Sequence, residues 1–155
     1  MHEEQPVTAR AEAAALYRPR RTLQPAIILA VAAGGALGAM ARYELGLRFA
    51  VAAGSFPWVT FGVNVSGSFL VGLLLTFVLE RWAPTRYARP FLAIGVLGTY
   101  TTFSTYSVEA NLLFKDGHVA VGVAYVLGSL AAGAVAVYLG IVTARLWPPR
   151  RRSER

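Results

Sequence analysis

Cysteine is absent from this chain of 155 residues, and it contains only two histidines, His2 and His118. Without cysteine there is no disulfide framework, no thiolate metal site and no thiol nucleophile. Both histidines lie outside the long apolar stretches of the sequence. Metalloenzyme and thiol chemistry are therefore excluded, and we expect no catalytic residues.

Charged residues are also missing from four long stretches. No Asp, Glu, Lys or Arg occurs in residues 23–41, 49–79, 91–108 and 119–144, which are 19, 31, 18 and 26 residues long. A helix needs roughly 20 mainly apolar residues to cross the hydrocarbon core of a bilayer. The stretches are apolar on all sides, whereas a soluble helix of this kind keeps one polar face. The sequence therefore predicts an all-α integral membrane protein with four transmembrane helices.

Basic residues outnumber acidic ones and give a net charge of +7. Most arginines flank the apolar stretches, where they suit anionic lipid headgroups and the setting of topology. We therefore expect the lipid bilayer as a partner and no nucleic acid. The first apolar stretch is too long for the core of a signal peptide, and three more follow it.

The chain divides into three parts. Residues 1–24 are polar or small and are expected to form a disordered cytoplasmic arm. Residues 25–146 form the transmembrane domain, with helices expected at about 25–48, 57–80 and 119–145 and a third helix after a basic connection at 81–90. Residues 147–155 form a basic cytoplasmic tail.

The third stretch is unusual for a helix that faces lipid. It contains Gly95 and Gly98, followed by a run of hydroxyl-bearing residues from Thr99 to Ser107. Glycines alone favour simple close packing of helices, but the polar run favours a break near the middle of this helix. Non-helical backbone inside a membrane must be buried in protein or line a cavity. Such breaks place freed carbonyls around cations and freed N–H groups near anions.

Other polar residues lie deep in the apolar stretches. An unpaired amide at Asn64 costs several kcal/mol in hydrocarbon, so Asn64 needs a partner or a pore. Asn64 with Ser68, and Tyr125 with Ser129, are each four residues apart and share one helix face. For both pairs, packing between or within helices remains open beside a role in a pore.

Two charged residues lie at the edges of the stretches. Arg42 either extends toward the membrane interface or faces a vestibule. Glu109 either pairs locally or faces the same vestibule, and the spacing does not decide. Small residues four apart, such as Gly34 with Gly38 and Ser68 with Gly72, are assigned to close helix packing.

The buried polar set consists of Asn, Ser, Thr, Tyr and Phe, with no charged group in the middle of a span. These side chains present N–H, O–H or positive aromatic edges. Such a lining suits a small anion, because neutral donors replace water around the ion without holding it permanently.

At these residues the sequence resembles the Fluc or CrcB family of fluoride channels, over about residues 25–145. The matching stretches are Gly34-Gly35-Ala36-Leu37-Gly38-Ala39 with Arg42-Tyr43, then Pro57-Trp58, Thr60, Val63-Asn64 and Gly67-Ser68-Phe69 with Gly72, and finally Gly98 and Thr101-Thr102-Phe103-Ser104-Thr105. The last stretch is the most specific. The sequence departs from the family pattern at Thr99, Tyr106, Val59 and Gly62.

The resemblance implies a fluoride-specific channel that exports fluoride passively and lowers its concentration in the cell. It implies an antiparallel dimer with a structural sodium ion held by the backbone carbonyls of Gly98 and Thr101. It also implies two fluoride paths, in which the ion contacts residues from helices 2, 3 and 4, namely Asn64, Phe103, Tyr106, Tyr125 and Ser129.

Two other functions compete with this one. A small proton-coupled multidrug exporter also has four helices, but it needs a carboxylate in its first span, and residues 23–41 have none. A noncatalytic membrane assembly subunit explains the small residues but not the polar cluster around Thr101.

The basic residues also predict an orientation. With four spans, the two termini and the connection at 81–90 share one side, which carries 12 Lys and Arg residues against 3 on the other side. This excess predicts that both termini are cytoplasmic in the bacterial plasma membrane. Because the family assembles oppositely oriented subunits, we expect a heterodimer with a second family subunit.

Overall fold

The computed structural model describes residues 24–49, 51–80 and 86–146. Except for residue 24, the expected N-terminal arm lies outside the described residues, as do the basic tail and the first half of the 81–90 connection. The described part is all-helical, as the sequence predicts.

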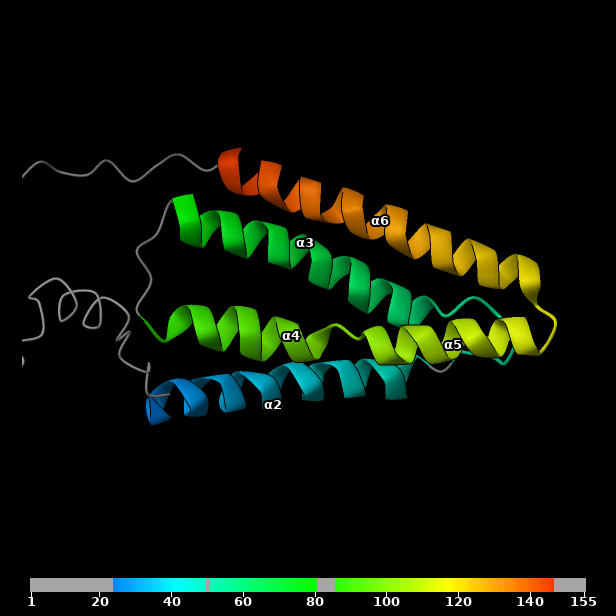
Figure 1. Cartoon of the computed structure of the whole chain (residues 1–155), viewed down its shortest axis with the longest axis horizontal. Helices are drawn as coiled ribbons and strands as arrows, with labels where there is room; N and C mark the ends of the chain where they lie inside the picture. Colours follow the sequence, from blue (N-terminus) through cyan, green and yellow to red (C-terminus); the bar gives the residue numbers. More distant parts are fainter. Residues whose placement is uncertain (1–23, 50, 81–85, 147–155) are drawn as a thin grey trace, which may run out of the picture.

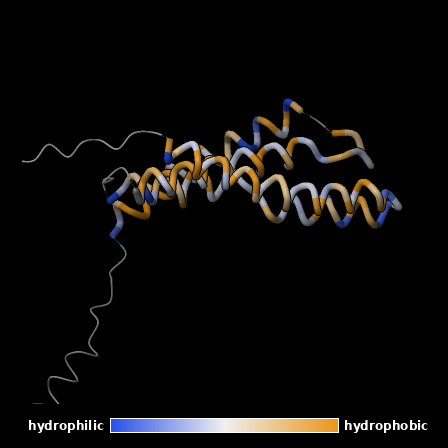
Figure 2. Tube along the Cα trace, turned by 90° about the horizontal axis from the view of Figure 1, so that it is seen from above, coloured by the Kyte–Doolittle hydropathy of each residue, from blue (hydrophilic) through white to orange (hydrophobic). Residues whose placement is uncertain are grey.

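Three of its helices are long and apolar enough to cross a membrane: α2 (Pro25–Arg48), α3 (Trp58–Glu80) and α6 (Val119–Leu146). Their bounds agree with the predicted ones to within one residue at each end. Pro25 fits the first helical turn of α2, where its missing N–H costs nothing. Apolar residues recur along the whole length of these helices (Figure 2), as expected for segments that face lipid or other helices.

The residues between α3 and α6 form three consecutive helical segments that lie between α2 and α3 (Figure 1). These are the π-helix η1 (Pro90–Val96), the short helix α4 (Leu97–Tyr100) and α5 (Phe103–Lys115). Thr101 and Thr102 both have extended backbone angles and separate α4 from α5.

The π-helical geometry of η1 was not predicted from the sequence. A π-helix carries wider turns than an α-helix and is often found near functional sites. Here η1 lies against α2, and a Cβ atom added to Gly95 would approach the Cα atom of Gly34 to 2.9 Å. The wider turns thus occur where two glycine backbones meet, a tertiary contact that no local pattern reveals.

Glycines bring the helices together in two places. In α2, a Cβ atom at Gly34 or Gly38 would overlap backbone carbonyls of η1. Between α3 and α6, a Cβ atom at Gly72 would overlap the Val137 carbonyl, and one at Gly140 would overlap the Phe69 carbonyl. The assignment of the small residues to helix packing is confirmed at Gly34, Gly38 and Gly72.

The loop from α2 to α3 and the turn from α5 to α6 lie at the same end of the molecule (Figure 1). Both use a glycine with positive φ, Gly54 at 77° and Gly117 at 82°. This end also holds the cluster of buried residues formed by Ala110, Leu113 and Tyr125. The polar groups described below lie between this cluster and the extended residues.

Candidate functional site

The extended residues between α4 and α5 are held by a side chain of α3. The Asn64 amide nitrogen donates to the Thr102 carbonyl at 3.0 Å, and the Thr102 N–H donates to Asn64 Oδ1 at 2.9 Å. In a continuous helix this N–H would instead donate to the Gly98 carbonyl. Asn64 therefore replaces the missing helical partner.

The start of α5 is stabilised locally by Thr102. Its hydroxyl oxygen accepts a hydrogen bond from the Thr105 N–H at 3.2 Å, which is the usual contact of an N-cap residue. The Thr102 backbone is thus fixed by Asn64, and its side chain is fixed by α5. Both interactions favour the extended geometry over a continuous helix.

The end of α4 is tied to α2. Arg42 Nε donates to the Thr99 carbonyl at 3.0 Å, so a positive charge lies at the carbonyl end of this short helix. The Thr99 hydroxyl lies 2.9 Å from the Gly35 carbonyl of α2 and 2.9 Å from the Gly95 carbonyl of η1. The family that this sequence resembles usually has a glycine at the position of Thr99. In this chain the Thr99 hydroxyl links α2 and η1.

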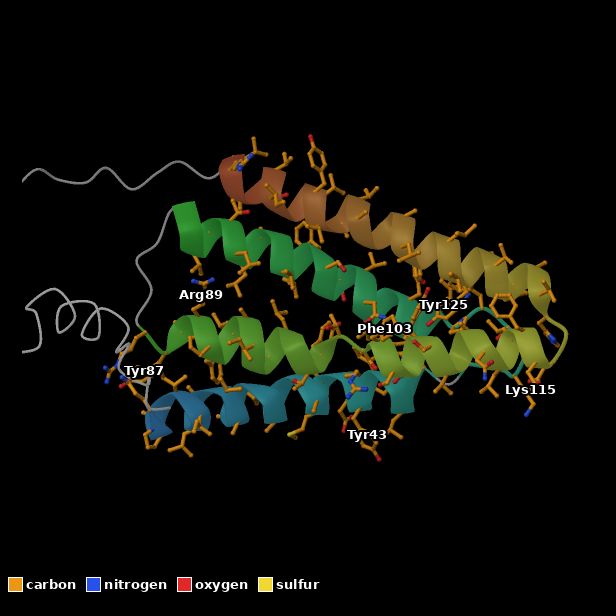
Figure 3. The ribbon with its side chains drawn as sticks, in the orientation of Figure 1. Tyr43, Tyr87, Arg89, Phe103, Lys115 and Tyr125 are labelled. Carbon is orange, nitrogen blue, oxygen red and sulfur yellow. The ribbon has the colours of Figure 1, made fainter. Side chains whose placement is uncertain are left out.

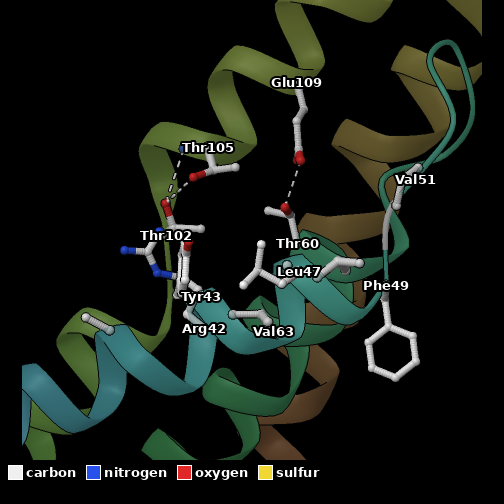
Figure 4. A pocket seen from close by; sticks show the side chains of 13 residues that line it. Arg42, Tyr43, Leu47, Phe49, Val51, Thr60, Val63, Thr102, Thr105 and Glu109 are labelled. Carbon is white, nitrogen blue, oxygen red and sulfur yellow. Dashed lines mark hydrogen bonds between the residues drawn. The ribbon is translucent and has the colours of Figure 1, made fainter.

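A cavity of about 410 Å³ lies between α2, α3 and α5. Arg42 and Glu109 both line it, together with Thr60, Thr102 and Thr105 (Figure 4). Both charged residues thus line one cavity, and their role in a vestibule stays a prediction. Arg42 also contacts the Thr99 carbonyl, and Glu109 is also paired.

The Glu109 carboxylate is held by two hydroxyl groups from different helices. Thr60 Oγ1 donates to Glu109 Oε1 at 2.9 Å (Figure 4), and the Tyr125 hydroxyl donates to Glu109 Oε2 at 2.8 Å. Each carboxylate oxygen therefore has a donor. This arrangement compensates a negative charge near the inner end of the cavity.

A second cavity, of about 340 Å³, lies on the other side of the extended residues. Four residues predicted for the fluoride path line this cavity, namely Asn64, Phe103, Tyr106 and Ser129. Thr101 and Thr102 line it as well. Thr102 borders both cavities. The Thr102 residue that Asn64 holds therefore lies between the two cavities.

Ser129 differs from the other polar residues of the second cavity. Within the described residues, its hydroxyl oxygen is the one buried side-chain polar atom without a hydrogen-bond partner. A serine in a helix commonly donates to a carbonyl of its own helix, but Ser129 does not. Its donor therefore remains available to something that enters the cavity.

Aromatic rings continue from the second cavity toward Glu109. Phe103 lies 5.9 Å from Tyr106, and Tyr106 lies 5.1 Å from Tyr125, measured between ring centroids. The Tyr106 hydroxyl donates to the Val126 carbonyl at 3.4 Å. Phe103 begins the series and is 80% exposed on the single chain, although it lies midway along the bundle (Figure 3).

Tyr125 and Ser129 share one face of α6 in the sequence, but they do not share one cavity. Tyr125 is fully buried and bonded to Glu109, whereas Ser129 faces the second cavity. The two residues predicted to bind sodium differ in position. Thr101 lines the second cavity, whereas Gly98 lines neither of the two cavities. No cluster of three or more His, Cys, Asp or Glu side chains suits a metal ion in the described part of the chain.

Sequence reasoning missed two parts of this site. Thr60 was noted only as part of a motif, although it lies four residues before Asn64 and eight before Ser68, on one face of α3. That spacing is a usable signal. The contact of Arg42 with the Thr99 carbonyl has no such signal, because the two residues are 57 positions apart.

Comparisons with known proteins agree on one family. A family model described as CrcB-like protein, Camphor Resistance (CrcB), matches residues 29–141. Fluoride-specific ion channel FluC 3 of Streptomyces avermitilis is 52% identical over 132 residues, which are 85% of this chain and 65% of that relative. The matched part thus spans just under two thirds of that protein.

Two further relatives are matched over most of their own length. Fluoride-specific ion channel FluC 2 of Nocardia farcinica is 43% identical over 123 residues, 79% of this chain and 88% of the relative. Fluoride-specific ion channel FluC of Nitrobacter winogradskyi is 44% identical over 120 residues, 77% of this chain and 95% of the relative. In all three comparisons the match extends over at least three quarters of the present chain.

Proposed function

This chain belongs to the CrcB-like protein family, and from that premise we propose that it is a subunit of a fluoride-specific ion channel. The observation that carries the proposal is the pair of cavities that share Thr102, the residue held by Asn64. Their lining offers amide, hydroxyl and aromatic groups, which replace the hydration shell of a small anion. The chain moves an ion rather than converting a substrate, so it is not an enzyme.

The protein crosses the membrane four times. Helices α2, α3 and α6 supply three crossings, and η1, α4 and α5 together supply the fourth, interrupted at Thr101 and Thr102. Support for this assignment comes from the position of these segments between α2 and α3 (Figure 1). It also comes from Asn64, which provides the freed backbone with the partner that lipid lacks.

Fluoride passes the second cavity and then the vestibule. In the second cavity it contacts Ser129, the edges of Phe103 and Tyr106, and the second N–H of the Asn64 amide. One N–H of that amide is used by Thr102, so one donor remains. Tyr125 continues the path beside Glu109, and Arg42 offsets the charge of Glu109 at the vestibule.

A second subunit covers the exposed face of the interrupted crossing. Phe103 is 80% exposed on the single chain, and the adjacent extended backbone cannot face lipid. The partner is a family subunit in the opposite orientation, which brings the two interruptions to the same depth. A structural sodium ion lies between them, bound by the Gly98 and Thr101 carbonyls of each subunit.

The channel lies in the bacterial plasma membrane with both termini of this chain in the cytoplasm. Hydrogen fluoride enters a cell as a neutral acid and dissociates there. The inside-negative potential then drives the anion outward, with a gain of about 2.3 kcal/mol per 100 mV for each charge. Export is therefore passive and lowers the fluoride concentration in the cell.

Efflux from proteoliposomes tests the proposal. The purified chain is reconstituted, alone and together with an oppositely oriented relative, and fluoride and chloride efflux are recorded with ion-selective electrodes. We expect fast fluoride efflux and little chloride efflux. Phe103→Ile is expected to slow fluoride efflux, because it removes the aromatic edge while keeping an apolar side chain. Equal permeation of both anions, or no efflux of either, would contradict a fluoride channel.

A further inference from the structure

Phe56 lies in the loop that precedes α3, outside the residues assigned to the fluoride path. Its ring is 5.3 Å from the Tyr125 ring, centroid to centroid, with an angle of 85° between the planes. Edge-to-face pairs of this kind contribute beyond their buried area. Tyr125 thus has ring contacts with both Phe56 and Tyr106, and the Tyr106 centroid lies 5.1 Å from that of Tyr125.

The position of Phe56 is itself well fixed. Its ring lies 4.4 Å from Trp58 and 5.3 Å from Phe61, and its carbonyl accepts a hydrogen bond from the Trp58 N–H at 2.8 Å. Pro57, which follows it, is buried and restricts the backbone at the start of α3. The loop therefore presents a rigid ring to Tyr125.

The Tyr125 side chain has little conformational freedom, except that its ring can tilt against the rings of Phe56 and Tyr106. It is fully buried, and its hydroxyl donates to Glu109 Oε2 at 2.8 Å. If the Tyr125 ring tilted toward the space of Phe56, this hydrogen bond would lengthen. Glu109 would then keep only the donor from Thr60, and its negative charge would be less compensated beside the vestibule.

We propose that Phe56 is a positioning residue for anion passage, which holds the Tyr125 hydroxyl on Glu109 through an edge-to-face ring contact. This inference rests on the proposed function and adds to it a residue that does not touch the ion. The loop before α3 thereby controls how strongly the Glu109 carboxylate opposes an anion in the vestibule.

The test compares Phe56→Leu and Phe56→Met, which remove the ring, with Phe56→Tyr, which keeps it. Tyr138→Leu is the control, because Tyr138 is an exposed aromatic residue of α6, the helix that carries Tyr125. We expect fluoride efflux to fall about threefold to tenfold in Phe56→Leu and Phe56→Met, the factor that corresponds to the contribution of one aromatic pair. Phe56→Tyr restores efflux, and Tyr138→Leu leaves it unchanged.

A double-mutant cycle separates positioning from general stability. In the Tyr125→Phe background the hydroxyl is absent, so Phe56→Leu should have no further effect on efflux. The same loss in both backgrounds, or an equal loss in Tyr138→Leu, overturns the proposal. If the Phe56→Leu variant does not fold, the double-mutant cycle is measured with Phe56→Met instead.

A measurement independent of transport completes the test. With 3-fluorotyrosine incorporated at Tyr125, the ¹⁹F resonance should shift or broaden in Phe56→Met and stay unchanged in Tyr138→Leu. An unchanged resonance in Phe56→Met overturns the proposal whether or not the chain conducts. Absent efflux from the unmodified chain reconstituted together with an oppositely oriented relative contradicts the proposed function instead, so the two failures are distinguishable.

Discussion

Asn64 and Thr102 exchange two hydrogen bonds, of 3.0 and 2.9 Å, between a side-chain amide of α3 and the extended backbone before α5. The two residues are 38 positions apart. This reciprocal pair satisfies both backbone groups of Thr102 at a place where lipid offers no partner. It also fixes the direction of the remaining amide N–H, so one residue both shapes the site and contributes a donor to it.

The first prediction is that Asn64→Ala lowers both stability and transport. Two hydrogen bonds in a protected site contribute together about 2 kcal/mol, and their loss leaves the Thr102 groups unpaired. Thermal unfolding in detergent and fluoride efflux are the measurements. Asn111→Ala is the control, since Asn111 is an exposed amide on α5. Wild-type stability and efflux in Asn64→Ala would show that the pair has neither role.

The second prediction separates stability from transport. Ser129→Ala removes a buried hydroxyl that makes no hydrogen bond in the protein, so we expect unchanged or slightly higher thermal stability. Fluoride efflux should fall, because the cavity loses a donor. Thr143→Val is the matched control on the same helix, since its exposed hydroxyl donates to the Leu139 carbonyl. Equal efflux in both variants would assign Ser129 to packing.

The third prediction uses two glycines of α2 with the same substitution. A Cβ atom at Gly38 would overlap the Val96 carbonyl and the Thr99 hydroxyl, whereas one at Gly46 meets nothing within 4 Å. Gly38→Ala should therefore lower thermal stability by separating α2 from η1. Gly46→Ala should raise it by up to about 1 kcal/mol through helix propensity. A stable Gly38→Ala variant would contradict the close approach of these helices.

The long helices could be predicted closely because their boundaries depend on local signals. Charge-free stretches, Pro25 and the turn at Gly117 define where α2 and α6 begin or end. The bounds of α3 follow in the same way from Pro57 and the charge at Glu80. In these segments, the requirement to span hydrocarbon overrides finer packing preferences.

The contacts within the site were less predictable. Asn64 was identified because a buried amide needs a partner, but nothing in the sequence indicates that this partner is the Thr102 backbone. The η1 segment and the pairing of Thr60 with Glu109 depend on tertiary contacts between distant residues. For Arg42 and Glu109, spacing left two interpretations, and it does not indicate that both residues line the same cavity.

The fourth prediction concerns the sodium ion proposed between the two subunits. Replacing sodium by N-methyl-D-glucamine should lower the melting temperature of the dimer by about 2–4 °C, which corresponds to roughly 1 kcal/mol for a chain of this size. Thr101→Val serves as the control, because the proposed ligand is the backbone carbonyl and not the side chain. That variant should keep its dependence on sodium. Equal melting temperatures and efflux in both cations would exclude the site.

The last prediction concerns orientation and follows from the basic residues. The side with the termini carries twelve of them: Arg10, Arg18, Arg20, Arg21, Arg81, Arg86, Arg89, Arg145, Arg150, Arg151, Arg152 and Arg155. The other side carries only Arg42, Arg48 and Lys115. Such an excess in short flanking segments directs insertion with both termini in the cytoplasm, so one chain does not adopt both orientations.

An antiparallel channel then requires a different, oppositely inserted subunit. Reporter fusions at each terminus should therefore give a cytoplasmic signal only, and the chain expressed alone should yield little fluoride efflux. Coexpression with a relative of opposite charge bias should restore efflux, and the two chains should purify together. Charge reversal at Arg81, Arg86 and Arg89 provides the control, because it weakens the bias and should allow termini on both sides. A functional channel from the unmodified chain alone, with termini on both sides of the membrane, would establish a homodimer and contradict the heterodimer.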